Sequence, residues 1–142
     1  MKRPVVAVLV GGAILGLGVS ISAQSSTYKA RLSPVPVEST NVAAITGTGA
    51  VTAVLTGASL SINGTFEGMK SPATLAQIHL GQRGVRGPVM FDLTVTKAVS
   101  GTITATIALT PVQVEALKQS RFYVQIHSEK APDGNLWGWI LP

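Results

Sequence analysis

Two histidines, His79 and His127, are the residues of this chain best suited to metal chemistry, because it contains no cysteine. Imidazole nitrogens bind copper or zinc, so two histidines on neighbouring strands would supply part of a metal site. The simpler alternative is that each ring donates a hydrogen bond to a nearby loop carbonyl. We favour it, because zinc sites usually take three or four protein ligands. The sequence therefore predicts no cofactor, with copper or zinc at His79 and His127 as the alternative.

Both histidines occupy the more polar side of a predicted strand. Alternate residues of a strand point to opposite faces, so His79 lies with Gln77, and His127 lies with Gln125 and Tyr123. The opposite faces are apolar and consist of Ala76, Ile78 and Leu80 in one strand and Phe122, Val124 and Ile126 in the other. If the two strands are neighbours, the histidines and glutamines form one polar cluster, with Tyr123 on the same surface.

Two tryptophans, Trp137 and Trp139, alternate with smaller residues near the C-terminus, so both indoles point to one side of the last strand. As an aromatic surface they would stack on a sugar ring or pack against a partner. Alternatively this side faces the core and the indoles fill it, which is the interpretation we favour.

No catalytic residues are predicted. The six acidic residues form no convincing pair, and no Gly-x-Ser-x-Gly motif is present. Glycines recur at 81, 84 and 87 around Arg83 and Arg86, but they lie between two predicted strands, so they indicate a connecting loop and not a phosphate-binding turn. We expect a protein that is not an enzyme.

The N-terminus resembles a signal peptide. Lys2 and Arg3 precede an uncharged apolar run over residues 5–19, and small residues follow up to Ala23. The pattern predicts a signal peptide over residues 1–23 and a secreted or periplasmic protein with no membrane contact after cleavage. An uncleaved membrane anchor is the alternative, although the run is short for a spanning helix.

The charge does not indicate nucleic-acid binding. Removing residues 1–23 takes away Lys2 and Arg3 and lowers the formal net charge from +5 to +3. The remaining cations are scattered, with Arg83 and Arg86 as the closest pair, and they form no basic stripe. Only a weak attraction to anionic cell-surface polymers is expected.

The elements that position these residues are mostly strands of a single domain, given a length of 142 residues. The clearest alternation runs over residues 101–109, where apolar residues and threonines take opposite faces. Residues 73–80, 89–95, 121–128 and 136–141 are further strands, and residues 41–66 have the composition of a meander. The count of about seven or eight strands predicts an all-β sandwich or barrel.

One short helix is predicted near residues 111–119. Thr110 and Gln113 form a capping box, and Pro111 suits the first helical position. Pro132, Asp133 and Gly134 predict a turn that joins the last two strands as a hairpin.

The chain resembles the CHRD domain, a repeat first described in chordin and found in secreted bacterial proteins. The resemblance covers about residues 27–142. It rests on the two histidine-bearing segments and the closing hairpin, together with these shorter stretches: Tyr28 to Ser33, Val35-Pro36, Gly87-Pro88-Val89 and Asp92-Leu93.

The resemblance implies an immunoglobulin-like Greek-key sandwich or barrel, an extracytoplasmic location and no established enzymatic activity. Two departures weaken a metal site. Gln77 stands where family members often have the first histidine of His-x-His, and Asn135 and Trp137 replace a glutamate and an arginine in the closing hairpin. The His-x-His form is similar to the copper-binding strand of Cu/Zn superoxide dismutases, another Greek-key sandwich.

Two functions follow from these residues. The first is an exported, non-catalytic binding or structural module of the cell envelope or extracellular space, with a protein or polysaccharide partner. It would use the polar cluster of Gln77, Gln125 and Tyr123 or the Trp137 and Trp139 surface. The alternative is a copper- or zinc-binding protein that uses His79 and His127, with redox activity as a further option.

Overall fold

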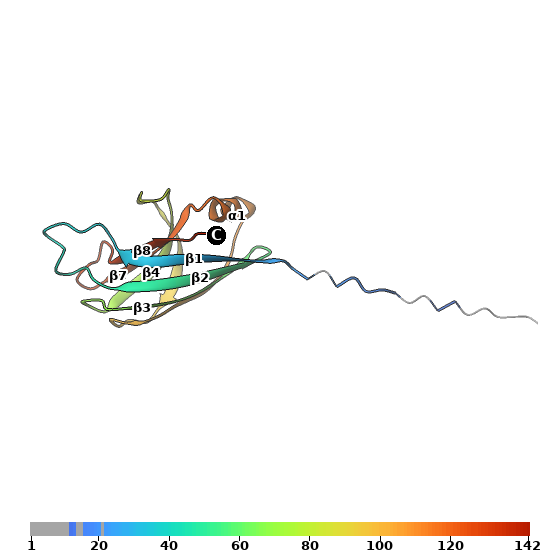
Figure 1. The fold of residues 1–142 in the computed structure, drawn as a ribbon, viewed down its shortest axis with the longest axis horizontal. Helices are drawn as coiled ribbons and strands as arrows, with labels where there is room; N and C mark the ends of the chain where they lie inside the picture. Colours follow the sequence, from blue (N-terminus) through green and yellow to red (C-terminus); the bar gives the residue numbers. More distant parts are fainter. Residues whose placement is uncertain (1–11, 14–15, 21) are drawn as a thin grey trace, which may run out of the picture.

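The computed structural model describes residues 12–13, 16–20 and 22–142. Eight antiparallel strands and one helix make up the folded part (Figure 1). In chain order they are β1 (Ser25–Pro34), β2 (Thr48–Thr56), β3 (Ser59–Glu67), β4 (Ala73–Leu80), β5 (Val89–Val95), β6 (Gly101–Ala108), α1 (Pro111–Lys118), β7 (Phe122–Ser128) and β8 (Leu136–Trp139).

The strands close into a barrel in the order β1-β2-β3-β6-β5-β4-β7-β8. The connection from β3 to β4 passes over β5 and β6, and the chain returns from β6 through α1 to β7, which gives a Greek-key arrangement. Closure comes from β1 and β8, where Ser33 pairs with Trp137 and Pro34 with Leu136. The predicted all-β fold with one short helix is confirmed, in its barrel form.

Alternation along the strands explains which residues fill the barrel. In β6, Ile103 and Ile107 are buried, whereas Thr102, Thr104 and Thr106 are exposed, as the sequence predicts. The largest fully buried apolar side chains come from every strand except β5, from α1 and from the residue that follows β8: Leu32, Val51, Leu60, Ile62, Ile78, Ile103, Leu117, Phe122, Ile126, Leu136 and Ile140. Each contributes about 1.5–3 kcal/mol by leaving water.

Helix α1 begins and ends as its sequence dictates. The Thr110 hydroxyl accepts a hydrogen bond from the Gln113 amide, and the Gln113 side chain accepts one from the Thr110 amide, so the predicted capping box is confirmed. Ser120, with φ of 57°, reverses the chain after the helix. Leu117 anchors the helix in the core.

The two tryptophans lie outside the barrel. Leu136 and Gly138 of β8, and Ile140 directly after it, are buried in the barrel interior, so Trp137 and Trp139 take the opposite face and are half-buried. A side chain at Gly138 would overlap the Arg31 carbonyl, so glycine allows β8 to approach β1 closely. The expectation that the indoles fill the core is therefore wrong, because the parity of β8 is set by Leu136 and Ile140.

Two predicted segments are shorter in the structure. The meander begins with β2 at Thr48 and not at residue 41, because residues 41–44 form a turn. The last strand ends at Trp139, after which Leu141 makes an isolated bridge to Lys29 of β1. The Pro132-Asp133-Gly134 turn does join β7 and β8 as an antiparallel hairpin, with Gly134 at φ of 136°.

The predicted signal peptide lies mostly outside the described residues, which omit 1–11, 14–15 and 21. Residues 16–20 and 22–24 have no regular secondary structure and extend away from the barrel (Figure 1). In the part of the chain that the structure describes, no helix has the length and hydrophobicity needed to cross a bilayer.

Candidate functional site

The two histidines meet on the outer face of the barrel. Strands β4 and β7 are antiparallel neighbours in which Gln77 pairs with Gln125 and His79 pairs with Tyr123. Both histidines point outward from the apolar interior, and their side chains approach each other across the paired strands. Their ring centroids are 6.3 Å apart, and the ring planes are inclined by 28°.

Each imidazole uses one nitrogen to hold a loop. His79 Nδ1 lies 2.9 Å from the Gly87 carbonyl, and His127 Nδ1 lies 2.7 Å from the Pro132 carbonyl. A carbonyl oxygen only accepts, so both Nδ1 atoms carry the proton and donate it. These are the loop hydrogen bonds that the simpler sequence interpretation predicts. In the neutral rings each Nε2 is then left with a free lone pair.

Both rings are removed from solvent at Nε2. His79 is 7% exposed. The Nε2 atoms of His79 and His127 are buried and have no hydrogen-bond partner. Burial lowers the pKa of His127 from its ordinary 6.5, and the neighbouring His79 and Arg86 act in the same direction, while the Pro132 carbonyl and Asp133 oppose it. His127 is therefore neutral at pH 7.

Aromatic rings continue this layer toward β8. Tyr123 stacks on His79 with centroids 4.9 Å apart, and Trp139 lies 4.6 Å from Tyr123 on the other side. Trp137 meets Trp139 edge-on at 4.8 Å. Edge-on and stacked pairs of this kind stabilise each other beyond their buried area. Five rings from three adjacent strands thus form one continuous outer layer, which we call the aromatic layer: His79, Tyr123, His127, Trp137 and Trp139.

Two loops cover the aromatic layer and fix its side chains. The Tyr123 hydroxyl accepts a hydrogen bond from the Gly87 amide at 2.9 Å, and the Trp139 indole donates to the Gly81 carbonyl at 3.0 Å. The loop of residues 81–88 therefore lies over β4, β7 and β8. Arg86 then joins it to the loop of residues 129–135, because it donates to the Asp133 carbonyl at 2.9 Å and lies 5.8 Å from the centre of the Trp137 ring.

The two glutamines of the predicted polar cluster, Gln77 and Gln125, have different hydrogen-bond partners. Gln125 is buried, and its amide donates to the Asp133 carbonyl at 3.0 Å, so it holds the second covering loop. Gln77 turns toward β5 instead, where its amide donates to the Asp92 carboxylate at 2.9 Å. Gln125 belongs to the support of the histidines, whereas Gln77 is engaged by the neighbouring strand.

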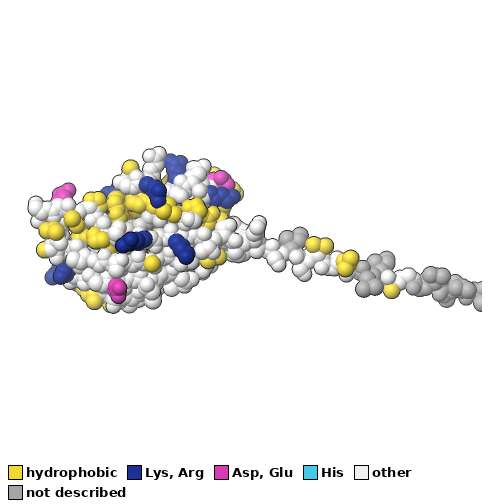
Figure 2. Space-filling view, viewed as in Figure 1, with side chains coloured by type: hydrophobic (Ala, Val, Ile, Leu, Met, Phe, Trp, Pro, Cys, Tyr) yellow, Lys and Arg dark blue, Asp and Glu magenta, His cyan; other side chains and the backbone are white. Residues whose placement is uncertain are grey.

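The tryptophans also line an open groove of about 240 Å³ between β8 and β1. Its other side chains are mainly Arg31 and Ser33 of β1 and Arg83 of the 81–88 loop. Figure 2 shows a band of hydrophobic side chains along the face that carries β8 and β1, with Lys and Arg side chains beside it. We call this feature the Arg–Trp groove. None of the described residues that line it has a carboxylate.

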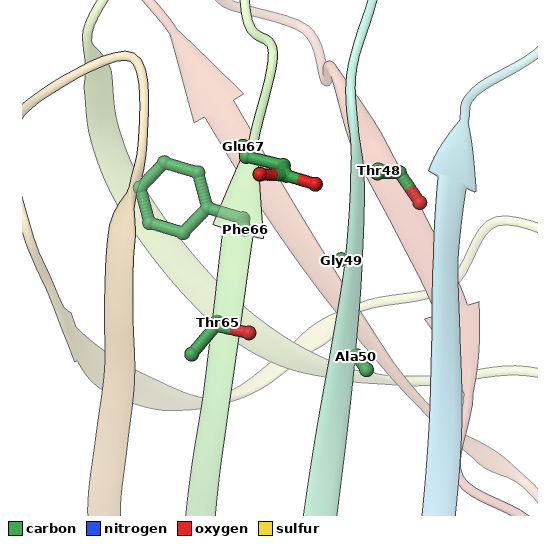
Figure 3. A pocket seen from close by; sticks show the side chains of 6 residues that line it. All are labelled: Thr48, Gly49, Ala50, Thr65, Phe66 and Glu67. Carbon is green, nitrogen blue, oxygen red and sulfur yellow. The ribbon is translucent and has the colours of Figure 1, made fainter.

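A second hollow of about 340 Å³ lies between one end of β2 and of β3 (Figure 3). Gly49 is one of its lining residues, and a Cβ there would come within 2.7 Å of the Thr65 carbonyl, so glycine allows β2 and β3 to lie close together at this point. The Phe66 ring points away from Thr48 and Glu67, which leaves Glu67 as the one charged group in the lining. A single carboxylate among threonines offers little for recognition, so the aromatic layer and the Arg–Trp groove are the better candidates.

The family of the chain agrees with this architecture. The family model for the CHRD domain matches residues 27–140, nearly the whole chain and all eight strands but for the first two residues of β1. The chain belongs to the CHRD domain family. CHRD domains are generally non-catalytic, which supports a non-enzymatic domain here. No curated protein and no solved structure matches this CHRD domain.

Sequence reasoning missed several residues that this CHRD domain uses. In the sequence, Arg31 is one of several scattered cations, and nothing indicates a role for the backbone of Gly87. The spacing of Arg83, Arg86 and the three loop glycines was the available signal, but it does not reveal that the loop folds back over β7. Asn135 was noted only as a departure from the family pattern, yet it is fully buried and joins the Ser128 hydroxyl to the Thr46 carbonyl.

Proposed function

We propose that this CHRD domain is an exported, non-catalytic binding module of the cell envelope or extracellular space, and that its Arg–Trp groove binds an acidic polysaccharide. The observation that carries the proposal is the composition of the groove. Arg31 and Arg83 flank Trp137 and Trp139, and the described lining residues supply no opposing carboxylate.

Each type of side chain in the groove suits one part of an acidic sugar. An indole presents a broad apolar surface on which the apolar face of a sugar ring can stack. An arginine binds a carboxylate through two parallel hydrogen bonds and stays charged at any physiological pH. A chain of uronic acids has both features at every unit, so it matches the groove better than a neutral sugar does.

The groove is held in shape before any ligand arrives. The Trp139 indole is fixed by its hydrogen bond to the Gly81 carbonyl, and Trp137 is held between Trp139 and Arg86. A site whose side chains are already ordered loses less conformational entropy on binding. The formal charge of +3 after removal of residues 1–23 adds a general attraction to acidic polymers.

Export is the part of the proposal that rests on the N-terminal sequence. Lys2 and Arg3 followed by the apolar run over residues 5–19 support a signal peptide that is removed near Ala23. Mass spectrometry of the protein recovered from a secreting host tests it, and the expected mature chain begins at residue 24. An intact N-terminus in the membrane fraction would favour the anchored alternative.

Binding is best tested through tryptophan fluorescence, because Trp137 and Trp139 are the only tryptophans in the chain. We expect oligogalacturonate to change the emission with saturation, and a neutral oligosaccharide of the same length to leave it unchanged. Arg31→Gln and Arg83→Gln should each weaken binding by about tenfold or more, since a hydrogen bond to a charged group contributes roughly 1.5–3 kcal/mol.

A matched control removes the same charge elsewhere. Lys97→Gln, in the turn between β5 and β6, should bind oligogalacturonate like the unaltered protein. Equal weakening by Lys97→Gln would mean that net charge and not the groove is responsible. Tighter binding of polyglutamate than of oligogalacturonate would assign the groove to an acidic peptide and overturn the polysaccharide proposal.

A further inference from the structure

Two unpaired nitrogens stand out in the aromatic layer. In the described part of the chain, His79 Nε2 and His127 Nε2 are the only buried side-chain nitrogen or oxygen atoms without a hydrogen-bond partner. Buried polar atoms are nearly always paired, because leaving one unpaired forfeits its hydration. Two such atoms on neighbouring strands, with His79 more than nine-tenths buried, point to a ligand that the two rings share.

The protonation of the rings defines what this ligand must be. Both Nδ1 atoms donate to backbone carbonyls, of Gly87 for His79 and of Pro132 for His127, so each Nε2 presents a lone pair. A lone pair binds either a hydrogen-bond donor or a metal ion. A loop carbonyl that fixes the tautomer and orientation of a histidine is the usual outer support of a metal-ligating imidazole.

The separation of the rings is compatible with one ion bound by both Nε2 atoms. Metal–nitrogen bonds to histidine are about 2.0–2.1 Å, and the centre of an imidazole lies about 1 Å beyond its nitrogen, so two rings on opposite sides of an ion have centres about 6 Å apart. The observed separation is 6.3 Å.

The surroundings select the ion. Zinc requires further protein ligands, and no group of three or more His, Cys, Asp or Glu residues suited to a metal occurs among the described residues. Cu(I) accepts two nitrogen ligands in line, and imidazole suits copper. The Arg86 charge also acts on His127, so an ion with one positive charge meets less repulsion there than an ion with two.

We propose that His79 and His127 bind one Cu(I) ion between their Nε2 atoms, beneath the covering loops. Tyr123, stacked on His79, belongs to the surrounding shell that keeps water out. The site uses none of the residues that line the Arg–Trp groove, so copper binding can be tested independently of polysaccharide binding.

The test is a competition for Cu(I) between the untagged full chain and the chromophoric chelator bathocuproine disulfonate, without oxygen and with ascorbate present. We expect one equivalent of Cu(I) per chain. His79→Asn and His127→Asn should each weaken Cu(I) binding by more than about tenfold. Asparagine is chosen because its amide can still donate to the Gly87 or Pro132 carbonyl while it removes Nε2.

A groove variant is the matched control. Arg83→Gln should retain Cu(I) binding, and both asparagine variants should retain oligogalacturonate binding. Failure of copper binding alone thus leaves the proposed function standing, and the converse also holds. Cu(I) binding that is equally tight in both folded asparagine variants would overturn the site, and so would tighter binding of Zn(II) than of Cu(I) by the unaltered protein.

A measurement on the unaltered protein keeps the test decisive if an asparagine variant does not fold. The ¹⁵N resonances of both Nε2 atoms should move in step on addition of one equivalent of Cu(I), while the Nδ1 resonances stay close to their original positions. Unmoved Nε2 resonances at saturating Cu(I) would show that the rings do not bind the ion.

Discussion

The two halves of the barrel wall treat their outer faces differently. In β6 the outward threonines are exposed and only the inward residues are buried. In β7 every residue is buried except His127, which is half-buried, so this strand is enclosed on both faces. We call β2, β3 and β6, which have one packed face, the open half, and β4, β7 and β8, whose outer faces carry the aromatic layer, the covered half; β1 and β5 lie between the two.

The difference shows what a covered outer face requires. The outward threonines of β6 are exposed to solvent, so burial does not force them to find a protein partner. On the covered half, His79, Tyr123 and Gln125 are buried, and each must bond to the backbone of a loop. The covering loops therefore create both an ordered aromatic surface and the two unpaired Nε2 atoms, and the candidate sites lie on this half for that reason.

The largest effect should come from Gly87, where the loop is pressed against β4. A Cβ at this position would overlap the Leu80 carbonyl, and Leu80 already donates to the neighbouring Pro88 carbonyl. We expect Gly87→Ala to lower the free energy of unfolding by about 3 kcal/mol or more, as backbone clashes in a packed site do. Urea unfolding measures it.

Val85→Ala, in the same loop, is the control, because Val85 is 55% exposed and should change stability by less than about 0.5 kcal/mol. A similar small loss for Gly87→Ala would show that the loop lies loosely on the barrel. Substitutions in the covered half would then lower the free energy of unfolding no more than substitutions in the open half.

An intermediate effect is expected at Tyr123. Its hydroxyl accepts the hydrogen bond of the Gly87 amide, which is part-buried. Tyr123→Phe keeps the stacked ring but leaves this amide unpaired, so the free energy of unfolding should fall by about 1–3 kcal/mol. Hydrogen exchange should also become faster at Gly87. Unchanged exchange at Gly87 would mean that water replaces the hydroxyl, and that solvent reaches this amide in spite of the covering loop.

The smallest effect should come from the open half. Thr104 is exposed in the centre of β6, opposite Asn63 of β3. Thr104→Ala should change the free energy of unfolding by about 0.5 kcal/mol or less, because it removes no buried contact. A loss as large as that of Tyr123→Phe in the same urea titration would erase the proposed contrast between the halves.

Local patterns in the sequence predicted much of this architecture. The threonine alternation of β6, the capping box at Thr110 and Gln113, and the outward position of both histidines follow from periodicities and hydrogen bonds within a few residues. The CHRD resemblance over residues 27–142 likewise agrees with the matched range 27–140.

The orientation of the tryptophans shows where local patterns fail. Alternation in β8 places both indoles on one side but does not say which side faces inward. The partner strand decides it: Leu136 pairs with the fully buried Ile126 of β7 and lies in the core with it. The indoles then take the outer face, where they contact Tyr123 and Arg31 lies in the same groove.

The sequence by itself determined the strands, the helix, the family and the face on which each histidine lies, because these depend on residues close together in the chain. Only the tertiary structure decided that β4 lies beside β7, that the 81–88 loop covers them, and that each Nδ1 is used while each Nε2 is unpaired. These features join residues as far apart as Gly87 and Tyr123, or Arg31 and Trp139. These distant contacts form together when the barrel closes, and no pattern of neighbouring residues in the sequence predicts them.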